Sequence, residues 1–248
     1  MNEDVASLPE LPLHAPAGEL VLYGVNRHNA LAILVFQALK SNVVVVDGRA
    51  TRHTFFDAKV VPAASLAQHM DVLYSASDGP PPNALPEGAR ADSYALDLAG
   101  QNRLTHAMRR LSAMQLYRIQ RRLHLAGLAR EAGFVHHFIF YRFNCRIPAT
   151  ATIGEETSLA YGGIGLVIHK DAQIGNRVKI GQNVTLGARA GGEGPPIIED
   201  DVFIGPNSVC LGGRIGKGAL VGAGSVVLRP VEAGSVVAGN PARVLRTS

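Results

Sequence analysis

One of the nine histidines in this 248-residue chain stands apart from the others. His169 is the sole histidine of residues 145–248, and it follows Ile168 at a position where neighbouring segments carry glycine. Because imidazole titrates near neutral pH, His169 could act as a general base toward a hydroxyl group. A bulky polar residue where the local pattern asks for glycine is typical of a functional site. It could equally be a tolerated corner residue, since Glu199 and Leu211 break the same pattern.

The pattern that surrounds His169 is a hexapeptide repeat. An aliphatic residue followed by glycine recurs at six-residue steps, at Ile153-Gly154, Ile174-Gly175, Ile180-Gly181, Leu186-Gly187, Ile204-Gly205, Ile215-Gly216 and Val221-Gly222. The apolar series continues through Ile147, Leu159, Ile168, Ile198, Cys210 and Val227. This period predicts a parallel β-helix with three flat strands in each coil of about 18 residues. We expect inward stacking of Ile168 over Leu186 over Ile204, with glycine permitting the tight corner between faces.

Two interruptions of the repeat mark places where binding residues could gather. Three extra residues separate Leu159 from Ile168, within the turn Tyr161–Gly165. Residues Gly187–Pro196 are too rich in glycine and proline for regular strands, so we expect a protruding loop there. Loops on a rigid scaffold carry binding and catalytic residues more often than the scaffold itself does.

Composition divides the chain into a small α/β domain at 1–100, a helical connector at 101–144 and the β-helix domain at 145–248. Nineteen of the 27 glycines lie in the last region, and residues 101–142 carry eight arginines against one acidic residue. In the first region, residues 19–23, 29–39 and 42–46 predict the strand, helix and strand of a βαβ unit. Weaker strands are expected at 59–61 and 71–74, and a loop at Asp78–Pro86.

The turn of the βαβ unit has one glycine, Gly24, where a dinucleotide fingerprint needs three, which argues against NAD or FAD. The positions of Gly24, His28 and Asp47 resemble the small N-terminal domain of bacterial sugar-nucleotide acyltransferases. That resemblance makes His28 and Asp47 candidate substrate-binding residues. The alternative is a purely structural βαβ unit with a solvated His28.

The basic segment predicts helix over residues 102–129. Its apolar stripe consists of Leu104, Met108, Leu111, Leu116, Ile119 and Leu123. The arginines lie mostly elsewhere, and we interpret them as a solvated face rather than a membrane-binding one. The aromatic run 134–143 is expected to cap the first coil, with His136 and His137 as packing residues rather than ligands.

Several classes of protein are disfavoured by composition. With 47% hydrophobic and 18% charged residues, the chain is too apolar to be disordered. It contains no apolar run of membrane-spanning length and no secretory leader pattern, so we expect a cytoplasmic protein. Cys145 and Cys210 make neither a disulfide framework nor a zinc spacing, and one histidine in the β-helix argues against a zinc carbonic anhydrase. On these grounds no metal is expected. No nucleic-acid partner is expected either, because the net charge is only +4 and no aromatic-rich basic motif is present.

Residues 115–248 resemble serine acetyltransferases and their relatives among the hexapeptide acyltransferases. The matching pieces are Leu116-Tyr117-Arg118, Ile147-Pro148, Ile153-Gly154, Gly165–Ile168, Gln182–Gly187, Gly222–Val227 and Gly239–Arg243. The resemblance implies a left-handed β-helix, a homotrimer, acetyl transfer from acetyl-CoA, and an active site between neighbouring subunits.

The acyl-transfer chemistry that the resemblance implies then suggests roles for individual residues. His169 would be the general base, with Tyr161 or a backbone N–H of the following glycine turn near the oxyanion. Acceptor-binding candidates are Gly162, Gly163 and Asn183. CoA-binding candidates are Gly187, Ala188, Gly205, Ala223, Gly224 and Ser225 along the pantetheine arm, and Lys217, Arg229, Arg243 and Arg246 for the phosphates.

Two family histidines are absent: the corresponding neighbourhoods read Tyr161-Gly162-Gly163 and Gly194-Pro195. Three functions therefore stay open. The first is an acetyl-CoA-dependent O-acetyltransferase acting on a small hydroxylated molecule. The second is an N- or O-acyltransferase of a nucleotide sugar, with the N-terminal domain holding the nucleotide. The third is a non-catalytic β-helix that binds a partner.

Overall fold

The structure, a computed structural model, describes residues 20–23, 27–47, 54–61, 71–75, 90–94, 96, 102–189, 194–211 and 213–247. The chain forms two compact units, one of Met1–Ala95 with Asn102–Leu104 and one of Leu96–Gln101 with Thr105–Ser248. The loop expected at Asp78–Pro86, Gly24 and the side chain of His28 lie outside the described residues. Within the described part, no helix is long and apolar enough to cross a bilayer.

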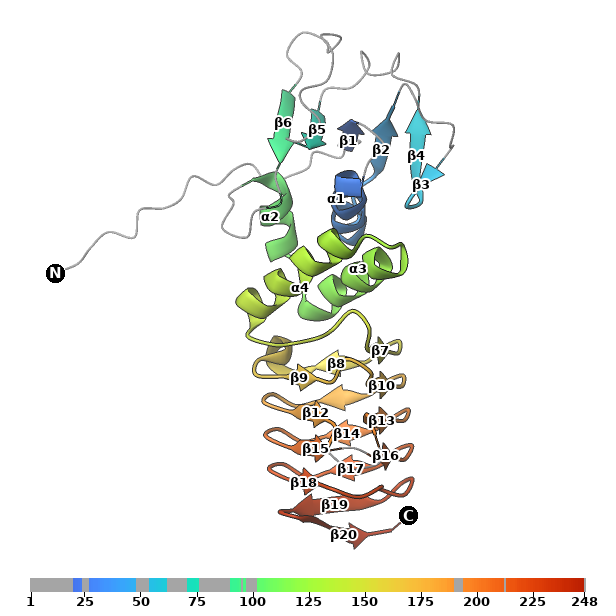
Figure 1. Ribbon diagram of the computed structural model, residues 1–248, viewed down its shortest axis with the longest axis vertical. Helices are drawn as coiled ribbons and strands as arrows, with labels where there is room; N and C mark the ends of the chain where they lie inside the picture. The colour runs from blue at the N-terminus through green and yellow to red at the C-terminus, as the bar shows by residue number, and fades with distance from the viewer. Residues whose placement is uncertain are drawn as a thin grey trace, which may run out of the picture. The chain divides into compact units, whose positions relative to one another are not determined.

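The first unit contains a six-stranded sheet in the order β3-β4-β2-β1-β5-β6. Its elements are β1 (Leu20–Tyr23), α1 (Arg27–Ala38), β2 (Val43–Val46), β3 (Thr54–Phe55), β4 (Ala58–Val61), β5 (Asp71–Ser75) and β6 (Arg90–Tyr94). All pairs are parallel except β3 with β4. The β-branched run of β2 is buried throughout, as expected for a central parallel strand. The predicted βαβ unit is confirmed, with its strands β1 and β2 side by side (Figure 1).

The helical segment contains three helices: α2 (Arg103–Arg109), α3 (Ala113–Leu125) and α4 (Ala129–Phe143). The continuous helix expected over 102–129 is interrupted before Ala113. Ser112 caps α3 by accepting from the backbone N–H of Gln115, and the Gln115 side chain accepts from the Ser112 N–H in return. This reciprocal capping box begins a new helix. All six residues of the predicted apolar stripe are nevertheless buried.

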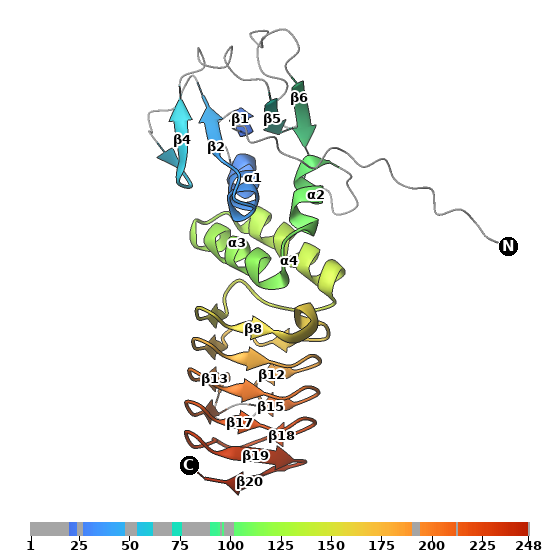
Figure 2. The same cartoon turned by 180° about the vertical axis from the view of Figure 1, so that it is seen from behind.

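Hydrogen bonds from α3 join the helices to the first coil. Tyr117 Oη donates to the carbonyl of Ala151 at 2.7 Å, and Arg121 Nη1 donates to the carbonyl of Ala149 at 2.8 Å. From α4, the expected cap, the ring of Phe143 lies against Gly162, whose added Cβ would be 3.5 Å away. Both helices therefore brace the start of the β-helix (Figure 2).

Three parallel sheets form the faces of the β-helix, and the chain visits them in turn. The β7 sheet comprises β7 (Thr152–Ile153), β10 (Gln173–Ile174), β13 (Ile197–Ile198) and β16 (Arg214–Ile215). The β8 sheet comprises β8 (Ser158–Leu159), β11 (Lys179–Ile180), β14 (Phe203–Ile204), β17 (Leu220–Val221), β19 (Val236–Gly239) and the antiparallel β20 (Ala242–Arg246). The β9 sheet comprises β9 (Val167–Ile168), β12 (Thr185–Gly187), β15 (Val209–Leu211) and β18 (Val226–Val227). The three corners between them are named here the β7/β8, β8/β9 and β9/β7 edges.

The expected stacking is half right. Ile168 pairs with Leu186, as predicted, but Leu186 then pairs with Cys210, and Ile204 pairs with Ile180 instead. The segment after β12 lengthens that coil, so partners on all three faces lie 24 residues apart at this step. Strands keep their face, because the additional residues of this coil lie between β12 and β13. The protruding loop was expected in this segment, and its residues 190–193 lie outside the described ones.

The role expected of the repeated glycines is wrong in its physical reason. Gly181 does not have a positive φ, and its neighbour two residues on, Asn183, does (φ 55°). A Cβ at Gly181 would lie 2.5 Å from the backbone nitrogen of Pro206. Glycine is therefore required because the next coil approaches closely, while the left-handed corner conformation belongs to residues further along the turn.

Candidate functional site

His169 follows β9 at the β9/β7 edge. Its backbone N–H donates to the carbonyl of Leu186 at 2.7 Å, and its side chain is 31% exposed. The same edge carries Gly187 and Leu211 at equivalent positions, paired with each other in register. A Cβ at Gly187 would meet only side chains, Leu211 at 3.3 Å and Thr185 at 3.7 Å. This edge therefore has room for side chains at the position where the backbone of the next coil crowds Gly175 and Gly181 at the other two edges.

A pocket of about 280 Å³ opens beside His169. It is lined by Arg146, Pro148, Val167, Ile168, His169 and Lys170. Arg146 was missed by the sequence analysis, because it precedes the first full repeat and belongs to no motif. A signal was nevertheless present, since Arg146 occupies the repeat position of Val167, with which it forms a parallel bridge.

Hydrogen bonding at His169 determines which nitrogen of its neutral ring carries the proton. The backbone N–H of Asp171 donates to His169 Nδ1 at 3.2 Å, and Asp171 Oδ2 lies 3.9 Å from the same nitrogen. Nδ1 therefore accepts, and the neutral ring carries its proton on Nε2. Lys170 Nζ binds Asp171 Oδ2 at 2.7 Å, and this bond is the main cause of the lowered pKa of the Asp171 carboxyl group. Asp171 thus stays ionised beside the imidazole at neutral pH.

Tyr161 lies in a different place from His169. It belongs to the 3₁₀ turn Ala160–Gly163 at the β8/β9 edge, where it is 82% exposed in a left-handed conformation with φ 49°. Gly162 and Gly163 also have positive φ values, of 70° and 87°. The width of the β9 sheet separates this turn from His169, so a single protomer does not bring the two predicted catalytic residues together. Asn183 shares the edge of Tyr161, and its Nδ2 donates to Asn207 Oδ1 at 3.1 Å.

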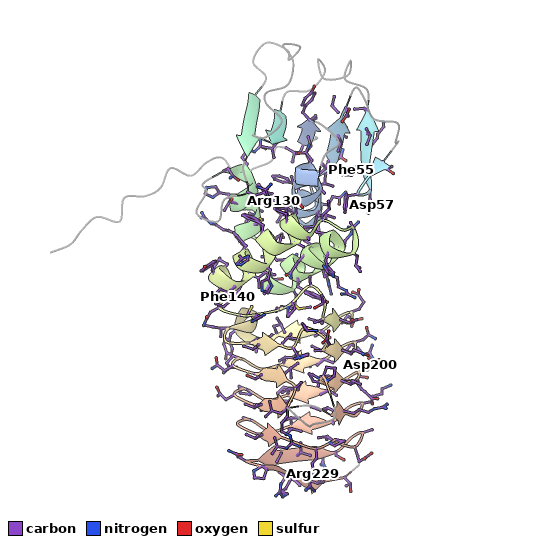
Figure 3. The ribbon with its side chains drawn as sticks, viewed as in Figure 1. Phe55, Asp57, Arg130, Phe140, Asp200 and Arg229 are labelled. Atoms are coloured by element: carbon purple, nitrogen blue, oxygen red, sulfur yellow. The ribbon has the colours of Figure 1, made fainter. Side chains whose placement is uncertain are left out.

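The predicted CoA-binding residues fall on more than one edge. The β8/β9 edge carries Gly205, Ala223, Gly224 and Ser225, and the β9/β7 edge carries Gly187, Ala188 and Arg229. The β7/β8 edge carries Lys217, and strand β20 carries Arg243 and Arg246. Ser225 is buried, and its hydroxyl donates to the carbonyl of Gly222 at 2.6 Å. Ala223 and Gly224 are exposed, as is Arg229 in the segment after β18 (Figure 3). The structure gathers most of these residues on the two edges of the β9 sheet and leaves Lys217 on the third.

In the N-terminal unit, the candidate residues lie at the carboxyl ends of central strands. Asp47 directly follows β2 and is half-buried, and the backbone of His28 lies in the first turn of α1. Asn29 is buried and donates to the carbonyl of Tyr23 at the end of β1, at 2.8 Å. The binding role of His28 and Asp47 stays a prediction. Across the described ranges, no group of three or more His, Cys, Asp or Glu side chains could hold a metal ion.

Comparison with known proteins relates the β-helix to enzymes. Residues 177–194 and 195–229 match the family described as hexapeptide repeat of succinyl-transferase. Serine acetyltransferase of Escherichia coli strain K12 is 39% identical over 136 residues, covering 54% of this chain and 50% of that protein. This chain thus spans about half the length of the curated relatives it matches.

Solved structures give the same relationship. The crystal structure of Neisseria gonorrhoeae serine acetyltransferase in complex with serine has a TM-score of 0.50 and 39% identity, covering 53% of this chain and 54% of that one. A serine acetyltransferase in complex with CoA has a TM-score of 0.50 and 34% identity, covering 54% and 55%. These matches confirm the left-handed form of the β-helix.

Proposed function

We propose that this chain, whose C-terminal part is a serine acetyltransferase-like hexapeptide-repeat domain, is an acetyl-CoA-dependent O-acetyltransferase of a small hydroxylated acceptor. The observation that carries the proposal is the imidazole of His169 beside a pocket of about 280 Å³ on this β-helix. The similarity to a serine acetyltransferase solved with CoA supports acetyl-CoA as the donor. A cytoplasmic location is part of the proposal.

The reaction follows from general acyl-transfer chemistry. The acceptor hydroxyl oxygen attacks the thioester carbonyl carbon while His169 takes the hydroxyl proton as general base. The carbonyl oxygen becomes an oxyanion, which Tyr161 or a backbone N–H of the Gly162–Gly163 turn would stabilise. As the oxyanion collapses, the C–S bond breaks and the proton passes to the leaving thiolate. The products are an acetyl ester and the free thiol of CoA.

The general-base role requires a proton shift within the imidazole. For Nε2 to accept the hydroxyl proton, the ring proton must first reside on Nδ1. The ionised Asp171 carboxylate, 3.9 Å from Nδ1, is the group that would stabilise a proton there. Asp171 is therefore proposed as the positioning residue of His169.

A trimer would complete the site. The four strands of the β9 sheet have uncharged outward side chains, Val167, Thr185, Val209 and Val226, and the cation of this face, Arg146, lies before the first strand. The other two sheets carry Lys179 and Arg214 at outward positions. In a three-fold ring, each contact joins two different surfaces of neighbouring copies. With three β9 sheets facing one axis, the β8/β9 edge of one copy would meet the β9/β7 edge of the next, bringing Tyr161 to the partner's His169.

The same seam would hold CoA. Ala188 and Arg229 on one edge would face Gly205, Ala223 and Gly224 on the neighbour's edge. Small residues let the pantetheine arm approach the backbone, and Arg229 would bind a phosphate. Gly187 would line the path of the pantetheine arm. Ser225 would contact the arm through its backbone, because its hydroxyl already donates to a carbonyl within the turn. The phosphate-bearing end of CoA is the only part of the molecule that Arg243, Arg246 and Lys217 would contact.

The N-terminal unit favours a second candidate function, acyl transfer to a nucleotide sugar. The strand order β4-β2-β1-β5-β6 is that of a doubly wound sheet with β1 at its centre. Ligands of such sheets bind beyond the carboxyl ends of the strands, where the strand order reverses. Asp47 and the start of α1 lie at those ends. A nucleotide-sugar acceptor would use this site as well as the pocket at His169.

Thiol release from acetyl-CoA tests both candidates, with serine, sugars and nucleotide sugars as acceptors. We expect turnover with one of these classes, and a loss of 10²-fold or more in His169→Ala. His169→Ala should keep CoA binding, measured by calorimetry, and the mass of the assembly, measured by ultracentrifugation. The matched control is His137→Ala, an exposed histidine on α4. Full activity in His169→Ala contradicts the general-base role, and absence of turnover with every acceptor favours a non-catalytic binding protein.

A further inference from the structure

The outward ladder of the β9 sheet begins with a cation. Arg146 precedes the buried Ile147, is exposed, and forms a parallel bridge with Val167 in the next coil. Its backbone is bonded on both sides: its N–H donates to the carbonyl of Leu166 at 2.8 Å, and its carbonyl accepts from the N–H of Ile168 at 3.0 Å. The backbone that carries this guanidinium is therefore held in register with the segment leading to His169.

The guanidinium of Arg146 has no carboxylate partner within 4.0 Å among the described residues. By contrast, Lys170 pairs with Asp171 at 2.7 Å, Arg177 with Asp201 at 2.7 Å, and Arg118 with Glu155 at 3.4 Å. Arg146 instead lines the pocket together with Pro148 and Val167, which supply apolar walls. A guanidinium presents a planar fork of donors that matches a carboxylate or a phosphate.

The size of the pocket limits what the guanidinium can bind there. At about 280 Å³ it lies near the lower end of small-molecule sites, which range from about 300 to 1,000 Å³. It therefore suits one small molecule or one terminal residue of a larger one. Because Arg146 and His169 line the same pocket, one such molecule can contact both.

We propose that the acceptor carries an anionic group, a carboxylate or a phosphate, which Arg146 binds while the hydroxyl to be acetylated lies at His169. This inference rests on the proposed function. It narrows the acceptor to acidic hydroxylated molecules, and it makes Arg146 the residue that selects them over neutral ones. The apolar walls of Pro148 and Val167 strengthen the charge pairing by excluding water from one side.

Matched acceptor pairs test this proposal. The pairs are glucuronate with glucose, glucose 1-phosphate with methyl glucoside, and serine with serinamide. In the wild-type protein the anionic member of at least one pair should have the higher kcat/KM, and the pair that responds distinguishes carboxylate from phosphate. In Arg146→Gln, KM for that anion should rise about tenfold to a hundredfold. In Arg146→Lys, KM for that anion should lie between the values of the wild type and of Arg146→Gln, since a point charge replaces the planar fork of donors.

The controls separate this inference from the proposed function. Arg118→Gln removes the same charge from an exposed ion pair, and it should leave KM for the anionic acceptor and KM for acetyl-CoA unchanged. KM for acetyl-CoA should stay constant in Arg146→Gln. Binding of glucuronate and of glucose 1-phosphate is also measured by calorimetry without acetyl-CoA, so that loss of binding in Arg146→Gln supports the anion site even where no turnover occurs. A preference for neutral acceptors, or anion binding equal in wild type and Arg146→Gln, overturns the inference.

Discussion

The backbone N–H of Asp171 donates to Nδ1 of His169 at 3.2 Å, while the carboxylate of the same residue lies 3.9 Å from that nitrogen. One residue therefore offers the imidazole two alternatives. Bonded to the N–H, the neutral ring carries its proton on Nε2; bonded to the carboxylate, it carries the proton on Nδ1. The ion pair with Lys170 at 2.7 Å draws the carboxylate away from the ring.

Asp171→Asn tests which alternative supports activity. The variant keeps the backbone N–H but removes the charge that would hold a proton on Nδ1. If His169 works as general base through Nε2, kcat should fall about tenfold or more, with KM for acetyl-CoA unchanged. The matched control is Asp200→Asn, a half-buried carboxylate at the β7/β8 edge (Figure 3), which should keep full activity. Equal kcat values for both variants would show that the Asp171 carboxylate plays no part.

Gly181→Ala should destabilise the β-helix. The added Cβ would lie 2.5 Å from Pro206 N and 2.7 Å from Pro206 Cα, both backbone atoms of the next coil. Displacing packed backbone costs about 1–3 kcal/mol. The matched control is Gly133→Ala in α4, where a Cβ would meet nothing within 4 Å, and which should stabilise by about 0.5–1 kcal/mol. Urea unfolding of both variants measures the free energies, and opposite signs are expected.

Both cysteines should be unreactive in the folded protein. Burial raises the pKa of the Cys145 thiol to about 11 and that of Cys210 to about 12. Since the thiolate is the reactive form and both residues are buried, neither should react with a disulfide reagent at pH 8 within minutes. In denaturant, both thiols should react. Rapid labelling of one thiol in the native protein would contradict the structure around that residue.

His136 should make the stability of the protein depend on pH. It is half-buried on α4 beside Gln120, and its pKa is lowered from 6.5, chiefly by burial. The unfolded state therefore binds more protons than the folded state just below pH 6.5. Stability is full above that pH and falls as the pH drops toward the folded pKa. Urea unfolding at pH 7.5 and 5.5 should show a loss that His136→Gln reduces and that the exposed His137→Gln retains.

The six-residue period alone predicted the β-helix and its inward residues, because each repeat carries an aliphatic residue at the position that faces the core. It did not predict the register. Leu186 stacks on Cys210 rather than Ile204, because a fixed count along the chain includes the interruption after β12, which the strand pairing skips. It also gave the wrong reason for Gly181, whose neighbour lies in the next coil.

Residue type and position in the sequence made His169 the candidate general base of the β-helix, because it is the sole histidine of residues 145–248 and stands where neighbouring segments carry glycine. Only the tertiary structure decided what surrounds it. Arg146 reaches the pocket by stacking one coil above Val167, and Tyr161 lies on the opposite edge of the β9 sheet. Both relationships depend on how coils stack and where corners fall, which long-range strand pairing sets and local spacing does not.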